Sequence, residues 1–225
     1  MRNEMKRILI IGTLLLNGLI SRADYRPLEL YEMIIKADKI VYGTIVGLDS
    51  NYYTLNIEGS LTSDSGTLKI ARFRDWPCAA RWTDYRVGQR LFLFLTSIDD
   101  DYLVMSAGNE GEHPIVDNSI FIHGFSIPIP PPSPPPGVTL RDDLIYFEPE
   151  HFDIYGGDYY GIQLDLDSFI ESVLFIRTYF NFTYAQYRAR TNWQIDCGKS
   201  ELELMCQKSK LVNWVNFEAT RKDER

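Results

Sequence analysis

The sequence predicts a mostly β protein of the α+β class: a five-stranded Greek-key barrel, preceded by a helix and followed by an α+β C-terminal extension. Three observations predict it. Five short runs with strand patterning lie between residues 40 and 107, one of these runs is apolar on both faces, and an amphipathic helical segment precedes them all. We expect a leader (1–23), a barrel (24–124), a proline-rich linker or loop (125–140) and the extension (141–225).

Residues 1–23 have the layout of a secretory signal peptide. Three basic residues precede an apolar run at 8–20, and Ser21 and Ala23 place small side chains at a cleavage site. The run is short for a bilayer-spanning helix, and the alternative is an uncleaved anchor. We therefore expect an exported chain, periplasmic or extracellular, with no membrane insertion after cleavage.

The charge of the chain excludes one class of partner. The net charge is −8 and becomes −11 when residues 1–23 are removed. Because an acidic surface repels phosphate backbones and anionic lipid, we expect no nucleic-acid binding.

The first elements follow from periodicity. Leu30, Met33, Ile34 and Ala37 recur at helical spacing, which predicts a helix over 27–37. Residues 40–48 are rich in β-branched side chains and predict a strand. The two glycines of that strand, Gly43 and Gly47, suit a strand that bends or that lets a neighbouring backbone approach closely.

The remaining barrel strands alternate with turns. Residues 53–58 alternate apolar and polar side chains, and strands are predicted again at 67–74, 90–96 and 102–107. The segment 75–82 is expected to be irregular or briefly helical. Five strands with this connectivity fit a barrel of the OB type, whose closure removes exposed strand edges.

The extension begins after a run of prolines. Seven of the eleven prolines lie in residues 127–137, which predicts an extended polyproline segment, either a stiff spacer or a recognition motif. A hairpin is expected to turn at Gly156-Gly157. Capping-box patterns at Ser168/Glu171 and Ser200/Glu203 predict the starts of two helices.

Residues 37–107 resemble the netrin-like module, the OB-type barrel shared by netrin C-terminal domains and tissue inhibitors of metalloproteinases. The resemblance lies in ADKIVYGTIV at 37–46, in Cys78 and in GQRLFLF at 88–94. The chain looks most like uncharacterised exported bacterial members. In the inhibitors an N-terminal cysteine chelates the protease zinc, whereas here no cysteine precedes Cys78, so that mechanism does not carry over.

One basic, aromatic segment stands out on the acidic chain. Guanidinium and aromatic faces together bind carboxylates, anionic glycans or partner proteins. The alternative is that the arginines pair with nearby acids while the tryptophans pack the barrel end. The candidate binding residues are Arg72, Arg74, Trp76, Arg81, Trp82, Arg86 and Arg90.

Other reactive side chains give weaker patterns. His113 and His151 each lie among acidic residues but lack a metal-binding spacing, so no metal site and no cofactor are expected. Cys197 and Cys206 either form a disulfide or remain buried thiols. No catalytic constellation is recognisable.

These observations lead to one expectation with two alternatives. The chain is expected to be an exported, non-enzymatic binding or structural protein whose partner is an unknown protein or an anionic glycan. A metalloprotease inhibitor is the first alternative, by analogy with the netrin-like inhibitors. A hydrolase that uses the acidic region 148–167 is the second.

Overall fold

The computed structural model describes residues 27–75, 79–99, 101–107, 110–129, 145–184 and 191–221. The predicted signal peptide, Trp76, Cys78 and most of the proline-rich segment lie outside these residues. Within them, no helix is both long and apolar enough to cross a membrane.

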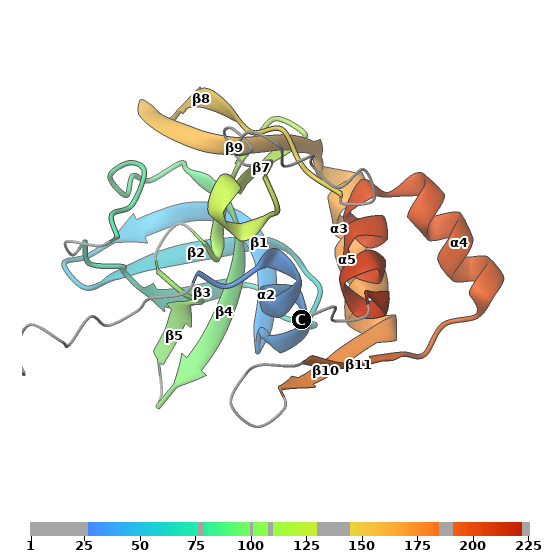
Figure 1. Ribbon diagram of the computed structural model, residues 1–225. Coiled ribbons are helices and arrows are strands. Elements are labelled where there is room, and N and C mark those ends of the chain that lie inside the picture. The colour runs from blue at the N-terminus through green and yellow to red at the C-terminus, as the bar shows by residue number, and fades with distance from the viewer. Residues whose placement is uncertain are drawn as a thin grey trace, which may run out of the picture.

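A closed five-stranded barrel of the OB type forms the first half of the chain, as predicted (Figure 1). Its strands follow the order β1-β2-β3-β5-β4, and β1 closes the barrel by pairing with β4. The strands are β1 (Lys39–Leu48), β2 (Tyr52–Ser60), β3 (Thr67–Ala71), β4 (Arg90–Ile98) and β5 (Asp101–Val104).

The glycines of β1 allow this strand to bend and to pair with both β2 and β4. The register between β1 and β2 shifts next to Gly43 and again next to Gly47, as bulges do where a strand bends. A Cβ at Gly43 would overlap the backbone oxygen of Asn56, so only glycine fits there. Both roles were expected from the sequence.

The barrel sheet continues into the rest of the chain. Strand β4 also pairs with β6 (Glu112–Val116), and the sheet goes on through β7 (Ser119–His123) and β9 (Gly157–Asp165) to β8 (Glu150–Ile154). A short 3₁₀ turn, η1 (Gly124–Ser126), follows β7. The β8–β9 hairpin therefore extends the same nine-stranded sheet to which the barrel belongs.

Helices cover the outer face of β4 and its neighbours. Helix α2 (Leu30–Lys36) precedes the barrel, while α3 (Leu166–Tyr179), α4 (Lys199–Lys208) and α5 (Lys210–Thr220) follow the sheet. Figure 1 shows α3 and α5 side by side, with α4 on their outer side. A second small sheet pairs β10 (Phe180–Tyr184) with β11 (Thr191–Ile195).

Two cores result because β4 is apolar on both faces. Leu91, Leu93 and Leu95 point into the barrel, whereas Phe92 and Phe94 pack outward against the helices. Trp214 of α5 is fully buried in the outer core beside Tyr31 of α2. The outer core thus joins the start of the chain to its end.

The structure corrects several predicted boundaries. The hairpin turns at Tyr155-Gly156, both with positive φ, so that Gly157 already belongs to β9. Helix α3 begins earlier than the expected box at Ser168/Glu171, because Asp165 caps it by accepting a hydrogen bond from the Ser168 backbone N–H at 2.9 Å.

The predicted last helix is in fact two helices. Residue Ser209 ends α4 and caps α5, accepting a hydrogen bond from the Val212 backbone N–H at 3.2 Å. Gly198, with no side chain to cap with, is the N-cap of α4, so the Ser200/Glu203 pattern marks the first turn of that helix and not its cap. The strands β6, β7, β10 and β11 were not predicted.

Candidate binding site

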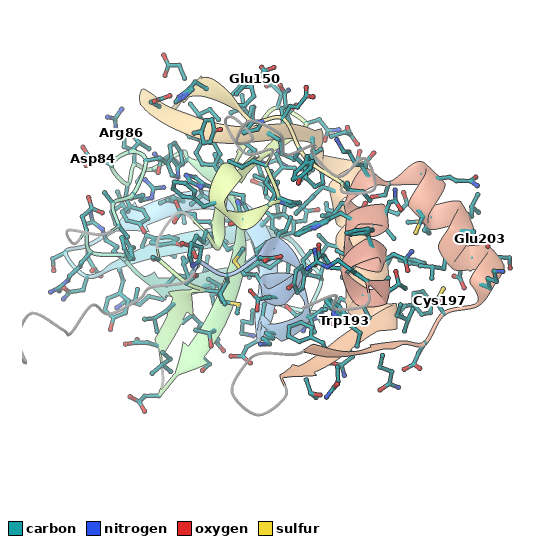
Figure 2. The ribbon with its side chains drawn as sticks, viewed as in Figure 1. Asp84, Arg86, Glu150, Trp193, Cys197 and Glu203 are labelled. Carbon is teal, nitrogen blue, oxygen red and sulfur yellow. The ribbon has the colours of Figure 1, made fainter. Side chains whose placement is uncertain are left out.

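Of the seven predicted binding residues, the structure describes all except Trp76, and these six differ widely in exposure. Arg81 is buried inside the barrel end, whereas Arg74 and Arg86 are exposed and Arg72 and Arg90 are half-buried. Figure 2 shows Arg86 and Asp84 projecting from the connection before β4, and the turn glycine Gly156 of the β8–β9 hairpin lies close to Arg86. A binding role for the exposed arginines stays a prediction.

Arg81 forms a buried ion pair with Glu112. Its Nη2 lies 2.5 Å from Oε1 of the fully buried Glu112, and its Nε donates to the same oxygen at 2.7 Å. Nη2 also donates to Gln89 at 3.1 Å, and the guanidinium lies 3.9 Å from the centre of the Tyr85 ring. Burial raises the pKa of Glu112, although Arg81 acts to lower it.

Three of the other arginines hydrogen-bond to residues that lie far from them in the sequence. Arg72 donates to the Asp49 carbonyl at 2.9 Å and Arg74 donates to the Asn51 side chain at 2.7 Å. Arg90 bridges Glu58 and the Asp117 carbonyl, at 2.6 and 2.7 Å. Trp82 packs edge-on to Tyr159 of β9, with ring centres 5.4 Å apart.

The three histidines do not converge on a metal-binding arrangement. Burial lowers the pKa of His113 to about 3 and that of His123 to about 4, so both are neutral at ordinary pH. His151 is exposed on β8 beside Asp158 at 2.8 Å. Within the described part of the chain, no group of three or more histidine, cysteine, aspartate or glutamate side chains could hold a metal ion.

Cys197 and Cys206 are free thiols, each partly buried. From the N-cap Gly198 to Cys206, helix α4 rises about 12 Å at about 1.5 Å per residue. A disulfide requires Cα atoms within about 7 Å, so a bond between these residues would need the first turns of α4 to unwind. The structure therefore has the unpaired form of the two alternatives.

A cleft of about 570 Å³ lies where the β8–β9 hairpin meets the C-terminal helices. We call it the β9 cleft. Its lining comes from three stretches of the chain, which are 147–152, 162–172 and 205–211. The apolar lining consists of Phe147, Phe152, Ile162, Leu164, Phe169, Met205 and Leu211.

The polar groups in the floor of the β9 cleft bond to one another. The Ser172 hydroxyl lies 2.8 Å from the Ser209 hydroxyl and donates to the Ser168 carbonyl at 2.7 Å. Ser209 also caps helix α5. Because these hydroxyls already serve the helices, the floor presents a largely apolar surface to an occupant.

The rim of the β9 cleft is acidic on one side. Glu148 and Glu150 are exposed and form no ion pair with any described residue, and Figure 2 shows Glu150 on the hairpin. On the opposite wall, Lys208 binds both carboxylate oxygens of Glu171, at 2.5 and 2.6 Å. Lys210 lies 4.9 Å from the centre of the Phe147 ring.

Sequence reasoning identified only one wall of this cleft. Glu150 and Asp165 lie in the acidic region named for the hydrolase alternative, but residues 205–211 reach the cleft only through the packing of α5 on α3. No local pattern could show that contact. No family model, curated protein or solved structure matches this chain, so the cleft is interpreted from its own geometry.

Proposed function

We propose that this chain is an exported, non-enzymatic binding protein that holds its partner in the β9 cleft. The observation that carries the proposal is the cleft itself, which combines an apolar floor with charged rim residues and has the volume typical of a ligand site. Export rests on the sequence of residues 1–23.

The chemistry of the cleft favours binding over hydrolysis. Among the described residues that line it there is no histidine or cysteine, and the two serine hydroxyls in the floor bond to each other. A serine nucleophile needs an adjacent base to activate it. The carboxylates of Glu148 and Glu150 instead stand at the rim, where they suit recognition of a partner's charge.

A photo-crosslinking experiment in the native host tests the proposal. A benzophenone amino acid is placed at Ser168, which is exposed at the rim, and in a second variant at Val46, which is 49% exposed on the barrel. The same discrete adduct is expected from Ser168 and not from Val46. Adducts that are absent or identical at the two positions would show that the cleft is not the binding site.

A second variant tests whether binding depends on the apolar floor of the β9 cleft. Leu164→Asp introduces a charge into the half-buried lining of the cleft and is expected to abolish the Ser168 adduct. Circular dichroism and the thermal midpoint verify that this variant folds. If it does not, the uncharged Leu164→Gln, which removes the same apolar side chain from the floor, provides the comparison.

A further inference from the structure

One edge of β9 opens into the β9 cleft. Strand β7 pairs with β9 from Gly161 to Asp165, but β8 pairs with it only from Gly157 to Gly161. Residues 162–165 therefore have a strand on one side only. No described backbone or side-chain group hydrogen-bonds to their other edge.

This open edge is the place where one further strand fits. Alternate residues of 162–165 turn their backbone N–H and C=O groups away from β7, toward the cleft. Backbone groups of this kind normally find a hydrogen-bond partner. An extended segment running along residues 162–165 would supply one, as in recognition by strand addition.

The walls of the cleft determine which side chains such a strand would carry. Ile162 and Leu164 share the face of β9 that packs on the helices, and Phe169, Met205 and Leu211 face the same space. Because side chains of a strand alternate, every second residue of the added strand would point at this apolar wall. The residues between would point toward the rim.

The rim favours positive charge. Its carboxylates are Glu148, Glu150, Asp165 and Glu171, against two lysines. Lys208 is already neutralised by Glu171, whereas Glu148 and Glu150 have no described ion-pair partner. The same carboxylates oppose pairing of this edge with a second copy of the chain, because like charges would meet.

We propose that the occupant of the β9 cleft is an extended, basic segment of a partner protein, which adds as a strand to residues 162–165 of β9. Its apolar residues alternate with lysine or arginine, and the basic residues face Glu148 and Glu150. This inference rests on the proposed binding function and specifies the partner's chemistry.

Selection from a phage-displayed random peptide library on the purified chain tests the inference. Enriched peptides are expected to alternate apolar and basic residues over the length of the open edge. A synthetic peptide of the enriched sequence is then methylated at alternate backbone nitrogens. Methylation along one edge is expected to weaken binding about tenfold or more, and along the other edge to leave it unchanged, because only one edge pairs.

Charge reversal provides the matched protein control. Glu148→Lys/Glu150→Lys is expected to weaken binding of the basic peptide about tenfold or more. Glu203→Lys, on the exposed face of α4 away from the cleft, is expected to leave it unchanged. Both variants alter exposed side chains and should fold normally.

The outcomes separate the two proposals. Enriched peptides with helical spacing or acidic residues, or binding that is insensitive to backbone methylation, would overturn strand addition. If the Ser168 adduct still forms in that case, the binding function stands and only the partner's chemistry is wrong. Loss of the adduct would contradict both the binding function and the strand addition.

Discussion

Arg81 and Glu112 form an ion pair inside the end of the barrel, with the side chains 3% and 1% exposed and the nitrogen and oxygen 2.5 Å apart. The arginine comes from the irregular connection before β4, and the glutamate is the first residue of β6. The ion pair therefore links the segment before β4 to the start of β6, the first strand of the sheet beyond the barrel. A residue predicted to bind a partner instead holds the fold together.

Removing one member of this pair should destabilise the protein strongly. Arg81→Met leaves a buried carboxylate without its partner and is expected to lower the free energy of unfolding by about 3–5 kcal/mol at neutral pH. The double variant Arg81→Met/Glu112→Leu removes both charges and should recover most of that loss. Urea denaturation of the two variants and the parent chain measures the difference.

Arg74→Met is the matched control, because this arginine is exposed and its one hydrogen bond to a described residue is an exposed bond to Asn51. Its effect should stay within about 0.5 kcal/mol. A double variant as unstable as Arg81→Met alone would contradict the interpretation, since it would mean that the uncompensated charge is not the source of the loss.

Stability should fall as the pH drops below about 6.5, the ordinary pKa of histidine. Burial holds the pKa of His113 at about 3 and that of His123 at about 4 in the folded chain. Between these values and 6.5 the unfolded chain binds more protons, so lowering the pH favours unfolding. At pH 4 each histidine should cost roughly 3 kcal/mol relative to pH 7.

Comparing His113→Phe with the parent chain isolates the contribution of His113 to the loss of stability at low pH. The ring of His113 packs edge-on to Phe94, and its Nε2 has no described hydrogen-bond partner. Its Nδ1 makes one long contact, 3.4 Å, with the Tyr159 hydroxyl, which also donates to the Phe121 carbonyl and keeps that bond, so phenylalanine should be tolerated at pH 7. The variant should then lose less stability than the parent between pH 7 and pH 4. The raised pKa of Glu112 acts in the opposite sense, but it is common to both chains and cancels.

His151→Gln provides the control, since this histidine is exposed on β8. Its urea midpoint at pH 7 should stay close to that of the parent chain. An equal pH dependence in the parent and in His113→Phe would show that His113 is not responsible for acid sensitivity.

Closure of the barrel should depend on Gly43. A methyl group at this position would overlap the Asn56 carbonyl across the β1–β2 pair, so Gly43→Ala is expected to cost about 2 kcal/mol. Gly47→Ala in the same strand has room for a Cβ against Thr54 and should be neutral or slightly stabilising. Equal thermal midpoints for the two variants would contradict the close approach.

The barrel could be predicted because its information is local. Alternating side chains, turn residues and the strand at 90–96 that is apolar on both faces can each be recognised within a few residues. Gly43 also indicated a bend in the first strand. The strands β6 and β7 were missed because they are short, and because Glu112 and His113 do not look like core residues. Their burial depends on Arg81 and Tyr159, which lie far away in the sequence.

The site could not be predicted for the same physical reason. Arg81 and Arg86 look alike in sequence, yet one is buried beside Glu112 and the other is exposed. The β9 cleft exists because β8 is shorter than β9 and because Ser209 breaks the last helical segment in two. Both facts belong to tertiary packing.

Hydrogen exchange along β9 tests the central claim most directly. The amides of residues 162–165 are measured with and without the selected basic peptide, and the amides of β1 serve as the internal reference. Strand addition predicts that alternate amides of 162–165 exchange about tenfold or more slowly when the peptide is bound, while β1 is unchanged. Unchanged exchange at 162–165 under saturating peptide would contradict the account.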